Sequence, residues 1–323
     1  VDKVRKLLLG ETESLVRDLE HDMNRAAERL RFEEAARLRE AIKALRSFAG
    51  RSNVVDFNSP GARDYIAQMM FNSPPGASDA MDLAMINEWA KTIPGNNFAI
   101  MAADYVWGQD SAKSFEAAVT GQGKKVGTKL FVPLGTKDYA PYIQQLKNAK
   151  ADAIWVADVS GAIAFTKQAA DFGLIPQTPL IGHALLSNFI VNATGNALTN
   201  VPGNVGYTPD IDTPQSKAFA AAFKARHNRL PSDTEGQAYN GTMVLLQGVK
   251  LAGSTKPLDV TKALRGAEVE TLYGKATVRP ADNQLLIPNY IARVKVADGV
   301  LRPVIEQSYP ATITPPASPL CKL

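Results

Sequence analysis

The stretch FAIMAADYVWGQDSAKSFEAAVT, residues 98–120, contains the alternation on which the fold of this chain depends. Its first part, 98–103, is a short apolar run of the length of a buried strand, and 111–120 follows as a helical stretch. A second apolar, β-rich run at 153–157 precedes an amphipathic stretch at 161–172. Strand followed by helix at this period predicts an α/β fold with a doubly wound parallel sheet and helices on both faces.

The same pattern extends outward from this stretch in both directions. Further strands are predicted at 126–132 and 179–186, and the helices beside them at 139–149 and 188–198. Three more helices are predicted downstream, at 214–226, 235–251 and 258–264.

Doubly wound sheets bind ligands at the carboxyl ends of their strands, so the loops that follow these strands are candidate binding positions. The candidate side chains in them are Trp107, Gln109, Asp158, Ser160 and His183. Each has a purely structural alternative. Asp158 or Ser160 can cap the next helix, Trp107 can pack over the sheet edge, and His183 can be a satisfied loop histidine.

Composition excludes several other classes of function. The 323 residues carry a formal net charge of +4 and a single cysteine, Cys321, which rules out an internal disulfide framework and a multi-cysteine zinc site. The three histidines are far apart in sequence, and no run of about 18 apolar residues is present. No nucleophile, base or metal constellation emerges, so neither catalysis nor a cofactor is expected.

The first 67 residues differ from the rest in charge density and in proline content. They carry 25 charged side chains, and the first 59 residues contain no proline. Apolar residues recur at spacings of three and four over 15–30 and again over 35–45, with a break in phase between the two stretches. This pattern predicts an antiparallel helical hairpin.

The second half of this hairpin closely resembles a known motif. Residues 30–42 (LRFEEAARLREAI) resemble the UVR motif of bacterial nucleotide-excision-repair proteins, and the flanks 4–12 (VRKLLLGET) and 51–66 (RSNVVDFNSPGARDYI) are similar to excinuclease protein C. The resemblance implies an element that docks excinuclease protein B, with Phe32 at the hairpin tip as the partner-facing residue. The alternative is Phe32 as the internal plug of the hairpin.

Residues from about 70 to 305 resemble the branched-chain-amino-acid type of periplasmic solute-binding protein. The motifs that carry the resemblance are DYVWGQ (104–109), DYAPYI (138–143), QAADFGL (168–174) and RPADNQLLIPNYIARV (279–294). The resemblance implies a type I binding-protein fold that holds a small solute between two α/β lobes and delivers it to the membrane subunits of an ABC importer.

By the same resemblance, Trp107 matches a cleft aromatic, and Tyr207 is a further ligand-binding candidate. His183 or its neighbour stands where amino-acid binders often place a carboxylate that neutralises the ammonium group of the substrate. Without Asp or Glu there, the expected solute is a small carboxylate or an amide rather than an ordinary branched-chain amino acid.

The predicted domains are a UVR-like segment at 1–67, a solute-binding region at 68–308 and a loose proline-rich tail at 309–323. Within the solute-binding region, a complete second lobe is expected from 76–201 plus 268–305, and an incomplete first lobe at 209–267. The helices between 214 and 264 are then expected to lack the sheet that they normally cover.

Two functions remain open. The first is the substrate-binding component of an importer, which is periplasmic by resemblance although no signal peptide is recognisable. The second is a cytoplasmic repair-associated interaction module. A chain that joins the two is expected to be a gene fusion or an assembled fragment, with its junction near 66–72.

Overall fold

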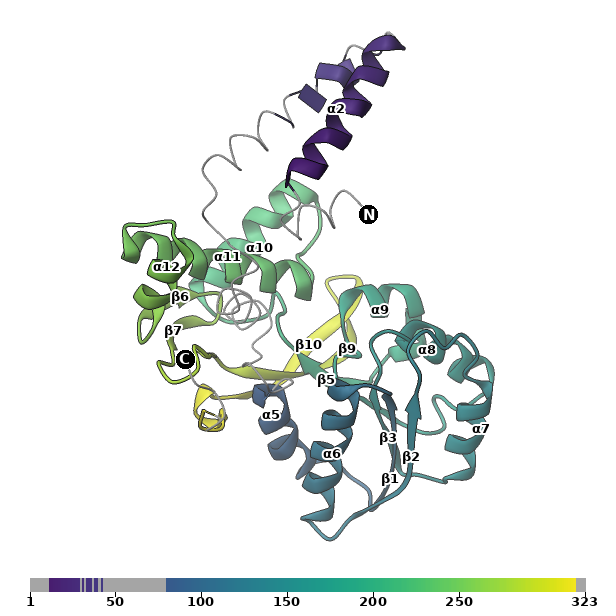
Figure 1. The fold of residues 1–323 in the computed structure, drawn as a ribbon. Coiled ribbons are helices and arrows are strands. Elements are labelled where there is room, and N and C mark those ends of the chain that lie inside the picture. The colour runs from purple at the N-terminus through teal and green to yellow at the C-terminus, as the bar shows by residue number, and fades with distance from the viewer. Residues whose placement is uncertain are drawn as a thin grey trace. The chain divides into compact units, whose positions relative to one another are not determined.

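The computed structural model describes residues 12–29, 31, 33–36, 38–39, 42 and 80–317 (Figure 1). The chain divides into two compact units. One consists of Val1–Ile66 with Leu245–Arg265, and the other of Ala67–Val244 with Gly266–Leu323. We call the second of these the sheet unit. In the described part of the chain, no helix combines the length and the apolar character needed to cross a bilayer.

A seven-stranded sheet is the centre of the sheet unit, with strand order β10-β9-β5-β4-β3-β1-β2. The five strands from β5 to β2 run parallel, whereas β9 is antiparallel to both β5 and β10. This arrangement confirms the predicted doubly wound sheet and adds an antiparallel hairpin to one edge. The strands are β1 (Asn97–Ala103), β2 (Lys125–Val132), β3 (Ala153–Ala157), β4 (Leu180–Gly182), β5 (Pro202–Val205), β9 (Asn289–Ala297) and β10 (Val300–Tyr309).

Helices cover both faces of this sheet, with α5 and α6 on one side and α7 and α8 on the other (Figure 1). Alternate residues of β1, namely Phe98, Ile100 and Ala102, share one buried cluster with Trp89 of α5 and Phe115 of α6. The period of two along the strand therefore sends every second side chain to the α5–α6 face. The helices are α5 (Ala80–Ala90), α6 (Val106–Thr120), α7 (Ala140–Asn148), α8 (Ala162–Asp171) and α9 (Asn188–Thr194), the last continued by the 3₁₀ helix η1 (Gly195–Leu198).

Two predicted boundaries move because of tertiary contacts. Helix α6 begins at Val106, five residues before the predicted start, and Gly108 in its first turn lies so close to β1 that a Cβ there would be 2.1 Å from the carbonyl oxygen of Ala103. Strand β4 ends at Gly182 rather than continuing to residue 186. Ala184 has φ of +58°, which is left-handed backbone that turns the chain out of the sheet.

A small sheet supports the next helices of the sheet unit. Strands β6 (Glu268–Thr271), β7 (Gly274–Val278) and β8 (Leu285–Leu286) pair antiparallel. Thr213 accepts a hydrogen bond from the Ser216 amide at the start of α10 (Pro214–His227) and donates one to the Leu272 carbonyl, 2.6 Å away. The Leu272 amide donates to Asn240 of α11 (Asp233–Ala252), at 2.8 Å.

These contacts revise the expectation that the helices lack a sheet. Phe219 of α10 is buried and stacks on Tyr239, with ring centroids 4.2 Å apart, whereas Leu246 further along α11 stays 62% exposed. The part of α11 up to Val244 therefore has a packing partner that the sequence did not predict.

The other unit contains helix α2 (Thr12–Glu28) and helical residues among 33–42. Val16, Leu19 and Ile42 are buried together, with Met23 and Leu38 packed against them. The two apolar stripes thus cover each other, as the predicted hairpin requires. In the same unit, α12 (Pro257–Leu264) packs on the second part of α11, where a Cβ on Gly248 would be 2.3 Å from Leu264.

The described part of the C-terminal segment, up to residue 317, makes contacts with the sheet unit, and its predicted looseness stays a prediction. Tyr309 is the last residue of β10, and the 3₁₀ helix η2 (Ala311–Ile313) places Ile313 against the α5–α6 cluster. Arg279 donates to the carbonyl oxygen of Pro315 at 2.6 Å. Cys321 lies outside the described residues.

Candidate functional site

The candidate site lies at the carboxyl edge of the parallel strands. Strands β1, β3 and β4 are neighbours in the order β4-β3-β1, so the loops that follow them meet at one edge of the sheet. Trp107 follows β1, Asp158 follows β3 and His183 follows β4. The three loops thus lie together as the sequence predicted, and their role in ligand binding stays a prediction.

Trp107 and His183 are brought into direct ring contact. Their ring centroids are 4.6 Å apart at an interplanar angle of 34°. His183 is only 1% exposed, because its amide donates to the Val156 carbonyl at 2.8 Å and holds the residue against the sheet. The imidazole therefore forms the back of the site, and the half-buried Trp107 ring covers it.

Ser111 and Trp155 fix the His183 ring from below. The Ser111 hydroxyl lies 2.8 Å from Nδ1 of His183 and accepts a hydrogen bond from Nε1 of Trp155 at 3.0 Å. All three side chains are buried. The imidazole is thus part of a satisfied polar cluster, which was one of the two alternatives that the sequence left open.

The outer part of the site carries Tyr105, which with Trp107 is one of the two aromatic residues of the run 104–109. Tyr105 is 41% exposed and stacks on Trp107, with centroids 6.1 Å apart and 24° between the ring planes. Gln109 donates from Nε2 to the exposed carboxylate of Asp104 at 3.1 Å. Two stacked rings thus lie at this edge, the exposed Tyr105 beside the half-buried Trp107.

Asp158 is occupied in holding its own loop. Its Oδ2 accepts from the Tyr139 hydroxyl at 2.7 Å, and its Oδ1 accepts from the Ser160 hydroxyl and from the Gly161 amide, each at 2.9 Å. The side chain is 3% exposed. Asp158 and Ser160 therefore organise the turn that precedes α8. Helix α8 has Gly161 as its N-cap and no side-chain cap bond, so neither residue caps it as the structural alternative required.

The same turn constrains two neighbours of the carboxylate. A Cβ on Gly161 would lie 1.5 Å from the Tyr139 hydroxyl oxygen, so only glycine fits there. Burial raises the pKa of Tyr139, and the hydrogen bond to Asp158 raises it further, so the phenol stays a donor throughout the physiological range. Sequence reasoning missed this role of Tyr139.

Tyr207 follows β5 but packs into the core. It is 1% exposed, its ring meets Phe219 at a centroid distance of 5.9 Å, and Gly236 lies directly against it. Burial raises the pKa of the Tyr207 hydroxyl. Its predicted role in ligand binding stays a prediction. Phe32, the predicted partner-facing residue, lies outside the described residues.

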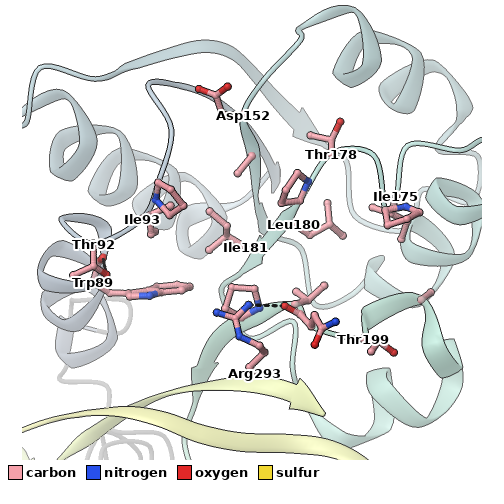
Figure 2. A pocket seen from close by; sticks show the side chains of 18 of the residues that line it. Trp89, Thr92, Ile93, Asp152, Ile175, Thr178, Leu180, Ile181, Thr199 and Arg293 are labelled. Carbon is pink, nitrogen blue, oxygen red and sulfur yellow. Dashed lines mark hydrogen bonds between the residues drawn. The ribbon is translucent and has the colours of Figure 1, made fainter. Parts of the chain in front are cut away.

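A pocket that sequence reasoning did not find lies at the opposite edge of the sheet (Figure 2). It has a volume of about 510 Å³ and lies where β3, β4 and β5 begin. Arg293, a cation in an otherwise mostly apolar strand, was the sequence signal that could have indicated it. Among the described residues, no group of histidine, cysteine and carboxylate side chains is arranged to hold a metal ion.

Two family profiles match the chain. The periplasmic binding protein profile matches residues 39–299, and the UvrB/uvrC motif matches residues 13–48. The two matched ranges share residues 39–48. The match to the periplasmic binding protein profile therefore begins well before residues 66–72, where the sequence suggested the junction.

Curated relatives fall into two groups. Leu/Ile/Val-binding protein homolog 6 of Brucella melitensis is 27% identical over 206 residues, which are 61% of this chain and 53% of that protein. The chain thus spans about half the length of the binding proteins it matches. UvrABC system protein C of Treponema denticola is 42% identical over 67 residues, which are 21% of this chain and 10% of that protein.

Solved structures agree with the first group. An ABC transporter substrate-binding protein from Sphaerobacter thermophilus has a TM-score of 0.64 at 26% identity, covering 73% of this chain and 66% of that one. A solute-binding protein from Rhodopseudomonas palustris BisB5, solved with 3,4-dihydroxybenzoic acid, has a TM-score of 0.65 at 25% identity, covering 72% and 65%. With the profile matched over most of its length and the doubly wound sheet in place, the chain belongs to the periplasmic binding protein family.

Proposed function

We propose that the sheet unit is the solute-binding part of an ABC importer substrate-binding component and that it takes a small planar carboxylate at the edge carrying Trp107. The observation that carries the proposal is the stack of Tyr105 on Trp107 above the buried His183. Stacked aromatic side chains offer a flat apolar surface on which a ring can lie.

The charges at this edge argue against an amino acid as solute. The Asp158 carboxylate already accepts three hydrogen bonds and is buried. The Asp104 carboxylate is exposed, where water and salt screen it. An ammonium group desolvated beside Trp107 would therefore lack a close counter-charge, which costs a few kcal/mol.

The relative solved with 3,4-dihydroxybenzoic acid supports this choice of solute, since it has the same fold and binds a ring carboxylate. The relatives named for leucine, isoleucine and valine are the reason to keep amino acids in the test. Delivery of the solute to membrane subunits, and a periplasmic location, are part of the same proposal.

Isothermal titration of the full chain with benzoate, 3,4-dihydroxybenzoate, urea and leucine tests the solute class. We expect saturable binding of the two benzoates and weaker or absent binding of urea and leucine. Tight binding of leucine would overturn the carboxylate proposal, because it would require a buried counter-charge for the ammonium group that the described residues of this edge do not supply.

A second proposed function rests on the N-terminal hairpin. The UvrB/uvrC motif match over 13–48 and the mutual packing of Val16, Leu19 and Ile42 support a hairpin that docks excinuclease protein B in the cytoplasm. A pull-down of purified excinuclease protein B by the full chain tests it, with Phe32→Ala expected to abolish capture. Unchanged capture by the Phe32→Ala variant would remove Phe32 from the proposed interface.

The union of the two segments in one chain is itself part of the proposal. The match of two different family profiles to one chain supports a fusion of a repair-type hairpin with a binding-protein segment. Sequencing of the genomic reading frame across codons 60 to 75 tests this idea, because a frame break there would indicate two separate genes.

A further inference from the structure

The pocket lies at the amino edge of the seven-stranded sheet, where the parallel strands begin, and therefore on the side away from Trp107. It is lined where three parallel strands begin, by Ala153 of β3, Leu180 of β4 and Pro202 of β5. Its volume of about 510 Å³ lies within the range of small-molecule sites in proteins.

Most of the pocket wall is apolar. Trp89 of α5 is 4% exposed, and Leu180 and Ile181 of β4 are 2% and 3% exposed. Trp89 also contacts Trp155 in the core, at a centroid distance of 6.1 Å, so its ring is held in place. Figure 2 shows these side chains gathered around the cavity, with Ile93 and Ile175. Such a wall suits a hydrocarbon body.

One end of the pocket carries a fixed guanidinium group. Nε of Arg293 donates to both carboxylate oxygens of Glu306 at 2.9 Å. Nη1 donates to the Asn200 carbonyl at 2.7 Å, the hydrogen bond drawn as a dashed line in Figure 2. Within the described residues Nη2 forms no hydrogen bond, which leaves it for an oxygen of a ligand. Because the group is already held, a ligand would lose little side-chain entropy on pairing with it.

The local charge around Arg293 is positive. Lys295 also contacts Glu306, at 2.7 Å, so two cations share one carboxylate and the group carries a net charge of +1. Glu306 is the extra residue of a bulge in β10, between the pairs formed by Ile305 and Gln307. Bulges of this kind commonly re-aim side chains beside functional sites, and Gln307 lines the pocket.

Asp152 lies across the pocket from Arg293 (Figure 2). Its Oδ2 accepts from the amides of Asn96 and Asn97, at 2.7 and 2.9 Å, and these hydrogen bonds lower its pKa. The ionised carboxylate at this rim disfavours a second negative charge on a ligand.

We propose that this pocket binds an amphipathic monocarboxylate, with the carboxylate on Arg293 and the hydrocarbon body along Trp89 and Ile181. The site is separate from the proposed solute site at the opposite edge. The apolar wall favours a ligand with a hydrocarbon body. The group of Arg293, Lys295 and Glu306 carries a single net positive charge and faces the carboxylate of Asp152, which favours a ligand with one carboxylate rather than two.

Isothermal titration of the full chain with octanoate tests the proposal, with 1-octanol as the uncharged control. We expect one saturable octanoate site and binding of 1-octanol that is at least ten-fold weaker. Arg293→Gln should lower the octanoate affinity at least ten-fold. Thr178→Trp, which fills the pocket from a lining position, should abolish binding.

Trp107→Ala separates the two sites, since it changes only the opposite edge and should leave octanoate binding unchanged. Loss of octanoate binding in Trp107→Ala, or its retention in both pocket variants, would overturn the proposal. Equal affinities for octanoate and 1-octanol would also overturn it, because Arg293 would then contribute nothing to recognition. Circular dichroism of each variant confirms that a loss of binding is not a loss of fold.

Discussion

Asp158 shows how a single buried carboxylate can be committed to the structure of a binding loop. Three donors saturate its two oxygens, and two of them come from residues within three positions along the chain. A buried charge is stable only when such partners are present. Asp158 therefore shapes the loop, and in the proposed function the aromatic side chains contact the solute.

Gly161→Ala should destabilise the sheet unit by about 1–3 kcal/mol, because the added methyl would overlap the Tyr139 hydroxyl and force the turn to shift. Chemical denaturation followed by circular dichroism measures the change. Gly121→Ala is the matched control, since Gly121 ends α6 with helical φ and ψ of −58° and −15°, which alanine also adopts. Equal free energies of unfolding for the Gly161→Ala variant and the wild type would contradict the prediction, because they would show that the turn shifts to accept the methyl group at no cost.

Trp107→Ala should weaken benzoate binding about ten-fold or more, because the ring that faces the proposed solute is lost. Isothermal titration measures the affinity. Phe172→Ala, which changes an exposed aromatic side chain outside both proposed sites, is the control and should bind benzoate as the wild type does. An unchanged affinity in Trp107→Ala would place the solute elsewhere.

At the scale of single elements, helix α11 begins with a reciprocal capping box. The Glu235 amide donates to the Ser232 hydroxyl at 3.3 Å, and the Ser232 amide donates back to the Glu235 carboxylate at 2.8 Å. Arg229 donates to both oxygens of the same carboxylate. These contacts satisfy amide groups that a helix start otherwise leaves unpaired.

This cap should make stability depend on acid pH. The hydrogen bond from Arg229, helped by those from Ser232 and opposed by burial, lowers the pKa of Glu235 from 4.5 to about 2. The stabilising contribution is therefore full above pH about 4.5 and is lost as the pH falls toward 2. Thermal unfolding from pH 5 to pH 2 should show a shallower decline for Glu235→Gln than for the wild type.

Glu88→Gln is the control for that experiment, since it removes an exposed pair with Lys91 that lies away from any helix start. Its pH dependence should follow the wild type. At neutral pH, Ser232→Ala should cost about 1 kcal/mol through loss of the cap. A decline in Glu235→Gln as steep as in the wild type would mean that the cap carries no pH-dependent stability.

At the scale of the whole molecule, the binding-protein fold and the hairpin belong to different compact units. The seven-stranded sheet begins at Asn97, and the cluster under α5 and α6 takes its first buried residue from Met85. Among the described residues, every buried member of this cluster comes from Met85 or later in the chain.

Deletion of residues 1–66 should therefore leave the thermal transition of the sheet unit within about 4 °C of the full chain, which corresponds to roughly 1 kcal/mol for a domain of this size. Differential scanning calorimetry of both chains measures the shift. The same deletion should remove the proposed capture of excinuclease protein B. A much larger fall in the transition temperature would show that the N-terminal segment stabilises the sheet.

The sequence by itself determined the types of element and the order in which they follow one another. The apolar runs at 98–103 and 153–157 became β1 and β3, and the apolar stripe of α2 pairs with the helical residues that follow it. These properties depend on periodicity within short windows, which the chain carries locally. The alternation of strands and helices along the chain also predicted that the candidate residues lie at the carboxyl edge of the sheet.

Only the tertiary structure decided what each candidate side chain does. It stacked His183 under Trp107, saturated Asp158, buried Tyr207 and connected α10 and the first part of α11 to a small sheet through Leu272. The pocket at the amino edge of the sheet is lined by both Trp89 and Gln307, which are far apart in sequence. Such contacts depend on which strands become neighbours and on the side chains they bring together, and no local pattern encodes either.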